Sequence, residues 1–526
     1  MNGAEALLKS LVDAGVKICF ANPGTSEMHL VSAIGRSNAI HPILCLFEGV
    51  VTGAADGYAR MADKPAITLL HLGPGLANGM ANLHNAKKAH VPLVNIVGDH
   101  APYHLQYDAP LTSDVAAHAA INSAWVETST SADDLARLGA VAVHEARRGT
   151  GKIATLIAAA NHAWEPAEKG YAELPAEPPA AVPAAQINEV AELLRNGKKT
   201  ALILGGRALR EEALVLVGRI ATKTRAPVFA ETFPTRQQRG SGRVSAARVP
   251  YFIEQALAVF GEYEQFVLIG APTPVAFFAY PNTPSVLLPE DGTVATLANV
   301  EQAVVPALEK LADAIDAGPG LEQLQQRVAP ESPHGLLTAG AIGDTLAALL
   351  PDNAIVSDEA VTCAAEVFER TAGAAPHDWL AITGGAIGQG LPVSFGAAIA
   401  CPDRKVVALQ GDGSAMYTVQ TLWSMSREQA DVVVVLLNND SYAILNFELA
   451  RLDTAPPNDK TLSMLDLGHP SIDWQNIARG MNVAATRATT AEEFHEQFAA
   501  AMKTRGPRLI EAMIHQDIGK PVRGDD

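Results

Sequence analysis

Short, continuous apolar runs that end in glycine or a polar residue recur along the chain, and helix-compatible spacing fills the segments between them. In the last third of the chain, residues 405–410 and 431–437 are two such runs, with a helical pattern over residues 414–428. Val- and Leu-rich runs without alternation are typical of strands buried on both faces of a parallel sheet. The pattern therefore predicts a strand–helix–strand unit and an α/β protein.

Two segments lack this pattern and are typical of linkers. Residues 164–187 are rich in Pro, Ala and Glu, and residues 316–335 contain AGPG and APESPHG on either side of a short helix-like piece. A chain of 526 residues accommodates about three domains of roughly 150 to 200 residues each. We therefore predict three doubly wound parallel-sheet domains, at residues 1–165, 186–320 and 336–520.

The middle domain begins with an apolar run that enters glycines, TALILGG at residues 200–206, and strand-like runs follow at residues 227–230 and 265–270. Gly205-Gly206 falls short of the full G-x-G-x-x-G pattern of dinucleotide sites. A structural turn is therefore the preferred interpretation, and nucleotide binding by this domain stays open.

The outer domains share an internal echo. GAADGYARMADKPAITLLHLGPG at residues 53–75 and GAAIACPDRKVVALQGDG at residues 396–413 both run from a small-residue helix, through an apolar strand, into a glycine-bearing turn. Such a match can arise by chance among α/β units. A true repeat implies two related sheets whose corresponding edges face one another and enclose a cofactor.

Composition and charge exclude several function classes. The formal net charge of −18 disfavours nucleic acid and anionic membrane as partners, because both would repel the chain. No window approaches the length of a membrane span, and residues 1–5 lack the basic start of a signal peptide, so a cytoplasmic location is expected. The cysteines show no C-x-x-C spacing, which argues against a zinc site or a disulfide framework. The charged tail at residues 516–526 favours disorder over a lid.

Polar residues follow both apolar runs of the last domain. Gly411-Asp412-Gly413 comes directly after the first run, and Asn438-Asn439 follows the second, at the same edge of a parallel sheet. A G-D-G sequence alone is a common tight turn. Its coupling to an Asn pair favours a different interpretation, because Asp and Asn oxygens beside glycines suit Mg²⁺ that also holds a diphosphate.

This arrangement resembles the cofactor signature of thiamine diphosphate enzymes. The resemblance implies that the side chains of Asp412 and Asn439 and the backbone carbonyl of Ser441 bind Mg²⁺, for which Ca²⁺ can substitute. It also implies cofactor contacts at these further positions: Gly411, Gly413, Ser414, Tyr442 and Thr362.

Glu48 is the candidate for cofactor activation. It is the only acid in the apolar run ILCLFEGVV at residues 43–51, and a carboxylate in apolar surroundings can share a proton with a ring nitrogen. The alternative is a charge that stabilises a helix amino terminus. The surrounding HPILCLFEGVVTGAADGYAR resembles the activating-Glu segment of the thiamine family, which favours a catalytic role.

A glycine-rich loop, TGGAIGQGLP at residues 383–392, carries the third family element. Glycines suit a loop whose backbone approaches a ligand closely, and Ile387 is a bulky apolar residue among them. The resemblance implies that Ile387 wedges beneath the cofactor and that the carbonyl of Gly385 accepts a bond from its pyrimidine amino group. The alternative is a strand-to-helix turn with a core isoleucine.

These elements, in this order, resemble those of the branch that holds acetolactate synthases, benzoylformate decarboxylases and related 2-oxo acid decarboxylases. The resemblance implies decarboxylation of a small 2-oxo acid, with an aldehyde or ketone as a possible acceptor of the acyl group. In this branch the activating carboxylate and the metal site come from different subunits. A homodimer is therefore the minimum, and homotetramers are usual.

Two amino-terminal residues resemble the substrate-handling positions of benzoylformate decarboxylase. Thr25 lies in the N-P-G-T loop of residues 22–25, where a hydroxyl group can bind a substrate carboxylate. His71 follows a predicted strand at residues 66–70, where an imidazole beside the cofactor can transfer protons near neutral pH. A buried, hydrogen-bonded core histidine is the alternative for His71.

Other positions depart from that enzyme. Residues 270–280 contain no histidine and present Phe277, while Asn446 and Glu448 bring polarity to a region that lines substrate pockets in relatives, together with Ile444 and Leu445. No counterpart of flavin-binding segments is found, which argues against FAD. A flavin-containing acetolactate synthase and a 2-hydroxyacyl-CoA lyase remain alternatives, and a non-catalytic cofactor-binding protein is the least favoured.

Overall fold

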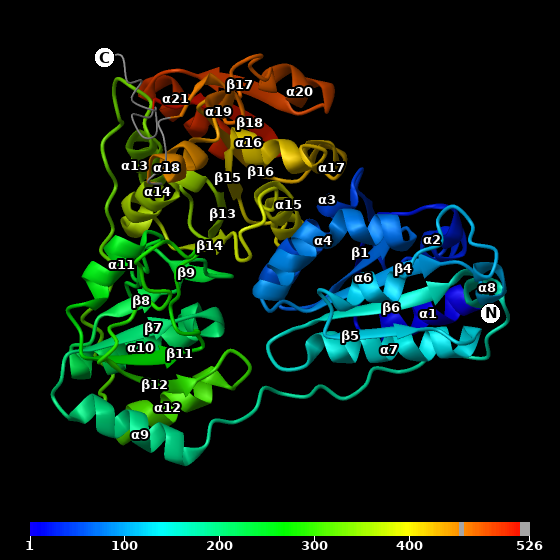
Figure 1. Cartoon of the computed structure of the whole chain (residues 1–526), viewed down its shortest axis with the longest axis horizontal. Coiled ribbons are helices and arrows are strands. Elements are labelled where there is room, and N and C mark those ends of the chain that lie inside the picture. Colours follow the sequence, from blue (N-terminus) through cyan, green and yellow to red (C-terminus); the bar gives the residue numbers. More distant parts are fainter. Residues whose placement is uncertain (452–456, 516–526) are drawn as a thin grey trace.

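The structure is a computed structural model that describes residues 1–451 and 457–515. Within those residues the strands form three sheets, each in its own region of the molecule (Figure 1). All pairings between neighbouring strands are parallel except one. The predicted fold class, three doubly wound parallel-sheet α/β domains, is therefore confirmed.

The amino-terminal sheet is buried on both faces, which explains its continuous apolar strands. In β3, Ala66 and Leu70 join the apolar cluster of α3 and α4, while Ile67 and Leu69 join that of α1 and α7. Its strands, in spatial order, are β2 (His41–Leu44), β1 (Ile18–Asn22), β3 (Ala66–Leu70), β4 (Leu93–Asp99), β6 (Ile153–Ala159) and β5 (Trp125–Thr128). The helices of this region are α1 (Gly3–Asp13), η1 (Thr25–Glu27), α2 (Met28–Gly35), α3 (Glu48–Ala62), α4 (Leu72–Lys88), α5 (Pro102–Leu105), α6 (Val115–Ala120), α7 (Ala132–Arg147) and α8 (Ala160–Trp164).

The middle sheet follows a long connection that crosses the lower part of Figure 1. The predicted linker extends too far by four residues, because α9 already begins at Ala184. The strands, in spatial order, are β10 (Ala247–Arg248), β8 (Val228–Ala230), β7 (Thr200–Leu204), β11 (Gln265–Ile269) and β12 (Thr293–Ala298). The helices are α9 (Ala184–Arg195), η2 (Gly206–Leu209), α10 (Glu211–Thr224), α11 (Ile253–Phe260) and α12 (Val304–Ala314).

The third sheet recruits a strand from the middle segment. The strand β9 pairs antiparallel with β14 at the sheet edge, which the sequence pattern does not predict. The spatial order is β17 (Ala484–Ala488), β18 (Arg508–Met513), β16 (Val432–Asn438), β15 (Val406–Gly411), β13 (Ala354–Glu359), β14 (His377–Ala381) and β9 (Gln237–Arg239). The helices are α13 (Ala339–Leu349), η3 (Val361–Cys363), α14 (Ala364–Arg370), η4 (Thr371–Gly373), α15 (Gly390–Ala400), α16 (Asp412–Ala415), η5 (Met416–Thr418), α17 (Thr421–Arg427), α18 (Ala443–Arg451), α19 (Asp459–Ser463), α20 (Trp474–Gly480) and α21 (Ala491–Met502).

Two predicted helical segments are corrected. The helix-like piece within residues 316–335 is extended instead, because Gly242 and Ser245 donate their N–H groups to Gln325 and Gln323, 2.9 Å each, as strand neighbours do. The helix predicted over residues 414–428 is divided into α16, η5 and α17, which together start earlier. There Thr418 turns its hydroxyl to a backbone carbonyl outside the helix, Gly388 O at 2.9 Å, and such bonds compete with helix continuation. The tail at residues 516–526 lies outside the described residues.

The two echoed segments meet face to face. Helix α3 of the first domain packs on α15 of the third, and one apolar cluster runs through both domains (Figure 1). Small residues allow this contact, because a Cβ atom on Gly57 would lie 2.1 Å from the carbonyl oxygen of Val393, and one on Gly396 would lie 1.9 Å from that of Ala54. The contact fixes the first and third sheets relative to each other. Among the described residues, no helix has the length and apolarity needed to cross a membrane.

Candidate active site

Glu48 is the first residue of α3 and follows β2 at the carboxyl edge of the amino-terminal sheet. The residue is buried, with only 7% of its surface exposed. One carboxylate oxygen, Oε2, accepts a hydrogen bond from Asn78 Nδ2 of α4 at 3.0 Å. The position satisfies both interpretations of Glu48, since a buried carboxylate at a helix amino terminus is also stabilised by the helix dipole.

His71 is held by a carboxylate that the motifs do not reveal. Glu27, which is 0% exposed, accepts a hydrogen bond at Oε2 from His71 Nδ1 over 2.8 Å. The same carboxylate accepts from the backbone N–H of Gly24 at 2.7 Å and from Ser26 Oγ at 2.6 Å. Because an ionised carboxylate only accepts, the proton of neutral His71 lies on Nδ1, which leaves Nε2 as the nitrogen able to exchange a proton.

Glu48 and His71 lie on two sides of the same glycine. A Cβ atom on Gly75 would be 3.2 Å from Glu48 Oε1 and 3.3 Å from His71 Cβ. Gly24 touches the His71 ring, and Thr25 follows it at the exposed start of η1. The structure therefore brings together the three amino-terminal candidates, which come from the loops after β1, β2 and β3.

The diphosphate half of the site lies at the carboxyl edge of the third sheet. Asp412 follows β15, and burial raises the pKa of its carboxyl group to about 6 despite hydrogen bonds from backbone groups of Gly413, Asn439 and Asp440. These bonds place Asp412 beside the Asn pair at the end of β16, as the spacing predicts. Asn438 is structural, since its amide bonds Glu511 Oε1 at 2.9 Å. The side chain of Asn439 accepts a hydrogen bond from the backbone N–H of Ser441 at 3.1 Å. This bond forms a turn at Ser441, whose carbonyl is the third predicted metal ligand.

The remaining predicted cofactor contacts cluster around this turn. Tyr442 covers Gly413 so closely that a Cβ atom there would lie 2.4 Å from the ring, so any side chain at this position would displace the ring. Ser414 Oγ donates to Gly411 O at 3.1 Å and accepts from Gln410 at 2.6 Å. Thr362 lies in η3, the short helix that follows β13, and β13 is the neighbour of β15 in the third sheet.

Helix α4 of the first domain holds the glycine-rich loop of the third. Asn85 accepts the N–H of Ala386 at 3.2 Å and donates to its carbonyl at 2.7 Å, and His84 contacts Gly384 O at 3.1 Å. Gly385 has φ +74°, a conformation that glycine adopts freely, and Ile387 is half-buried beside it. The helical spacing of Asn78, Asn82 and Asn85 on one face of α4 is the sequence signal for this contact.

A second buried acid, Glu359 at the end of β13, anchors the far side of this loop. It accepts the N–H groups of Gly388, at 2.5 Å, and Gly390. Burial raises the pKa of Glu359 to about 7, although these bonds and one from Gln410 oppose the shift. Sequence motifs do not identify this residue.

The donor set fits Mg²⁺ bound together with a diphosphate. No group of three or more His, Cys, Asp or Glu side chains capable of holding a metal is found in the described residues. One carboxylate with neutral amide and carbonyl oxygens suits a hard cation that takes its remaining ligands from phosphate. Asp412, Asn439 and the Ser441 carbonyl are the residues that would hold it.

The candidate substrate wall borders the same loop. Phe277 lies over Gly385, where a Cβ atom would be 2.4 Å from the ring, so an aromatic side chain borders the glycine-rich loop. Glu448 of α18 accepts a hydrogen bond from Tyr280 at 2.6 Å. Ile444 is half-buried and Leu445 is exposed on the same helix.

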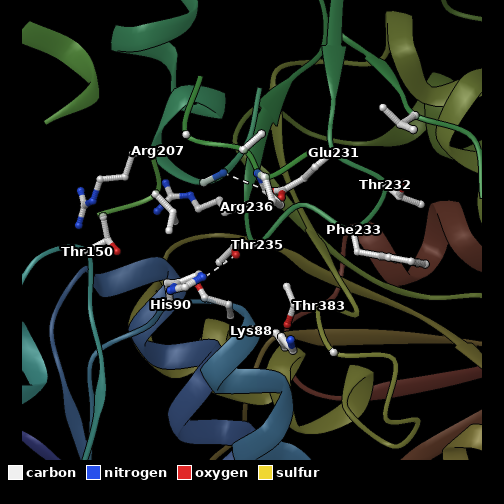
Figure 2. A pocket seen from close by; sticks show the side chains of 18 of the residues that line it. Lys88, His90, Thr150, Arg207, Glu231, Thr232, Phe233, Thr235, Arg236 and Thr383 are labelled. Carbon is white, nitrogen blue, oxygen red and sulfur yellow. Dashed lines mark hydrogen bonds between the residues drawn. The ribbon is translucent and has the colours of Figure 1, made fainter. Parts of the chain in front are cut away.

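A cavity of about 750 Å³ extends from this wall into the middle domain (Figure 2). Lys88, His90, Arg207, Phe277 and Thr383 are among the residues that line it. In Figure 2, Lys88 lies beside Thr383, whereas Arg207 lies beside Thr150. The Gly205-Gly206 turn reaches it but is explained by packing, because a Cβ atom on Gly205 would lie 2.7 Å from Gly270 O. Gly206 donates its N–H to Glu231 at 3.0 Å, so this group is already bonded, and burial raises the pKa of Glu231 to about 7. The preferred interpretation of a structural turn agrees with this geometry.

Comparisons with known proteins match both halves of this site. Residues 1–123 match the family described as thiamine pyrophosphate enzyme, N-terminal TPP binding domain, and residues 360–512 match the corresponding C-terminal TPP binding domain. A candidate acetolactate synthase large subunit of Mycobacterium tuberculosis, IlvX, is 46% identical over 99% of this chain and 100% of its own length. The chain belongs to the thiamine pyrophosphate enzyme family.

Two further relatives place this thiamine enzyme within its family. Benzoylformate decarboxylase of Pseudomonas aeruginosa is 28% identical over 94% of this chain and 96% of its own length. The structure of a 4-hydroxybenzoylformate decarboxylase from Rhodococcus jostii RHA1 superimposes with a TM-score of 0.84, at 25% identity, over 98% of this chain and 100% of that one. The protein is an enzyme of the decarboxylase and acetolactate-synthase-like branch, and its TPP-binding domains make thiamine diphosphate its cofactor.

Proposed function

We propose that the enzyme uses thiamine diphosphate and Mg²⁺ to decarboxylate a 2-oxo acid, and that it can transfer the acyl group to an aldehyde or ketone. The observation that carries this proposal is the arrangement of Glu48 and the His71–Glu27 pair around Gly75, at the carboxyl edge of the amino-terminal sheet. The corresponding edge of the third sheet carries Asp412 and Asn439. It supplies one group to activate the cofactor and another to move a proton at the product carbon.

Each residue has a separate task in this proposal. Thiamine diphosphate, when bound, supplies the nucleophilic carbon and the electron sink of the reaction. Glu48 would share a proton with the pyrimidine ring of the cofactor. Asp412, Asn439 and the carbonyl of Ser441 would hold Mg²⁺, and Gly385 and Ile387 of the glycine-rich loop would bind the cofactor. Thr25 binds the substrate carboxylate. His71 Nε2 delivers the proton that completes an aldehyde product.

We further propose that two subunits complete each site, in a homodimer at minimum and a homotetramer by analogy with the family. Large apolar side chains remain exposed next to both halves. Tyr107, 68% exposed, follows β4 on the edge that bears Glu48, and Tyr417, 53% exposed, follows α16, which begins at Asp412. Large exposed side chains such as these, next to both halves of the site, support an interface with another protein surface.

Acetolactate formation is the second candidate, favoured by the 46% identity to IlvX. Synthases of this kind transfer the acyl group to a second 2-oxo acid instead of protonating it. The product decides between the two activities. An assay of 2-oxo acids with and without an acceptor, following carbon dioxide and the organic product, therefore distinguishes decarboxylation from ligation, and a flavin absorbance would favour a true acetolactate synthase.

The variant Glu48→Gln tests the proposal. It retains size and the hydrogen bond from Asn78 but cannot share a proton, so turnover should fall by roughly 10²- to 10⁴-fold while calorimetry shows unchanged binding of thiamine diphosphate and Mg²⁺. The exposed acid Glu127 of the same domain provides a matched control, and Glu127→Gln should keep full activity. Full activity in Glu48→Gln would refute the assignment.

Chelation should remove activity, and Mg²⁺ or Ca²⁺ should restore it.

A further inference from the structure

An ion pair between Asp56 and Arg60 lies within α3, the helix that begins at Glu48. The carboxylate accepts Arg60 Nε at Oδ1 and Arg60 Nη2 at Oδ2, each over 2.8 Å. Both side chains are 0% exposed. A buried ion pair adds little net stability, because the cost of removing two charges from water offsets most of their attraction. The further groups that this pair binds therefore indicate its role.

Arg60 uses all five of its N–H donors. Two go to its carboxylate partner, and Nη1 donates to the carbonyls of Thr235 at 3.2 Å and of Ala381 at 2.7 Å. The fifth goes from Nη2 to Thr383 Oγ1 at 3.0 Å. A guanidinium presents its donors in one rigid fork, whereas an ammonium carries three on a single atom. The fork therefore fixes the first residue of the glycine-rich loop at residues 383–392.

Asp56 binds the other end of the same loop. Its Oδ2 atom also accepts a hydrogen bond from Gln389 Nε2 at 2.7 Å. Gln389 is only 2% exposed and directly precedes α15. Thr383 and Gln389 are therefore bound to the two members of one buried ion pair, and the glycines of the loop lie between and next to them.

The loop depends on such contacts, because its own sequence does not define one backbone shape. Gly384, Gly385, Gly388 and Gly390 leave the chain many accessible conformations. Gly385 and Gly388 lie at φ +74° and +92°, in the left-handed region. Ordering these residues costs conformational entropy, and a cofactor that met an unordered loop would have to supply that free energy from its own contacts.

We propose that Asp56 and Arg60 are positioning residues for the cofactor. They clamp both ends of the glycine-rich loop, so that its backbone already has the shape that binds thiamine diphosphate. The inference rests on the proposed function, in which this loop contacts the cofactor. The pair acts through the loop and carries out no chemical step, so its effect falls on cofactor affinity.

Changes of similar size at the two loop contacts test the clamp without leaving a buried charge unpaired. Thr383→Val removes the hydroxyl group, and Gln389→Met removes the amide group. In calorimetry of the full chain freed of cofactor, with Mg²⁺ present, each variant should raise the Kd for thiamine diphosphate roughly 10-fold, and the double variant roughly 100-fold. At saturating cofactor, kcat should stay within about 2-fold of wild type, because the loss is one of uniform binding.

The variant Arg60→Lys tests the ion pair itself. It keeps a positive charge beside Asp56 but loses the fork, so it should weaken cofactor binding at least as much as Thr383→Val does. Thr383→Ser keeps the hydroxyl group and should bind the cofactor as wild type does.

Thr371→Val is the matched control. Thr371 is buried in the same domain, accepts Arg239 Nη1 at 2.8 Å and donates to Val367 O at 2.8 Å. Thr383 bonds in the same way, since it accepts from an arginine and donates to a backbone carbonyl, but Thr371 lies outside the loop. Thr371→Val should lower the temperature of unfolding and leave the Kd for thiamine diphosphate unchanged.

Wild-type affinity in the double variant or in Arg60→Lys would overturn the inference. An equal loss of affinity in Thr371→Val would also overturn it, because the loss would then come from general destabilisation. A fall in kcat at saturating cofactor without a change in Kd would do the same. Binding of thiamine diphosphate that depends on Thr383 and Gln389, without carbon dioxide release from any 2-oxo acid, would overturn the proposed function alone.

Discussion

At the residue scale, the pair of His71 and Glu27 decides which imidazole nitrogen can exchange a proton. We expect Glu27→Gln to lower kcat by roughly 10- to 100-fold with little change in KM, because the neutral amide can hold the ring in either tautomer and in more than one orientation. His71→Ala should slow product protonation and change the ratio of aldehyde to ligation product. Steady-state kinetics with product analysis measure both effects.

A double variant shows whether Glu27 acts through His71. If Glu27 only positions the imidazole, Glu27→Gln combined with His71→Ala should be no slower than His71→Ala alone. Additive losses would instead show that Glu27 stabilises the fold or contacts substrate independently. Calorimetric affinity for thiamine diphosphate, which depends on the other end of the site, serves as the control for intact structure.

Spacing and composition identify the residues that act on the cofactor better than the residues that support them. Asp412 and Asn439 can be located because each follows an apolar strand, and Glu48 because it is the only acid in an apolar run. The sequence pattern does not identify Glu27 or Glu359. A buried acid in a loop or at a strand end has no periodic signal, and its hydrogen-bond partners come from segments distant in sequence.

At the scale of elements, the continuous apolar runs correctly predict the parallel strands that carry the site. The failures share a cause in tertiary contacts. Residues 316–335 become extended because residues 242–245 offer strand-like hydrogen bonds, and β9 joins the third sheet because the edge of β14 is open to it. Neither partner is visible in the local pattern, so sequence periodicity alone cannot locate them.

The strand β14, which lies between β13 and β9, contains a histidine whose burial makes stability depend on pH. His377 is fully buried, donates Nδ1–H to Ala375 O at 2.7 Å, and has no partner for Nε2 in the described residues. Burial, with a contribution from the charge of Arg239, lowers the pKa of His377 to about 3. The unfolded chain therefore takes up this proton below about pH 6.5 while the folded chain does not, so the contribution to stability is lost as pH falls from 6.5 towards 3.

We expect the free energy of unfolding to fall by about 2 kcal/mol between pH 7 and pH 5 on account of this group alone. His377→Asn keeps a donor for Ala375 O but does not titrate, so its loss over the same interval should be smaller by that amount. Urea unfolding at the two pH values measures the difference, and the comparison of slopes removes any constant cost of the substitution. Equal losses in wild type and variant would contradict the assignment.

At the scale of the whole molecule, the α3–α15 contact joins the two outer domains of one chain into a continuous apolar core. This contact uses the small-residue faces of the echoed helices, while the strand edges that bear Glu48 and Asp412 carry exposed apolar residues such as Tyr107 and Tyr417. Exposed apolar residues gathered at one edge mark a surface that another protein surface covers. The arrangement supports sites that are closed by a second copy of the chain.

Complementation between two inactive variants tests this arrangement directly. Glu48→Gln removes the activating acid and Asp412→Asn the metal-binding carboxylate, so each homo-oligomer should be nearly inactive. If the two groups of one site come from different chains, a hybrid dimer contains one site with both groups intact and one with neither. A random 1:1 mixture formed by co-expression should then recover about a quarter of wild-type activity. If both groups come from the same chain, every site in every hybrid lacks one group and the mixture stays inactive, because association cannot restore a missing residue. Separate purification of hybrids carrying two different tags should raise the recovered activity to about half, which distinguishes true complementation from contamination by wild-type enzyme.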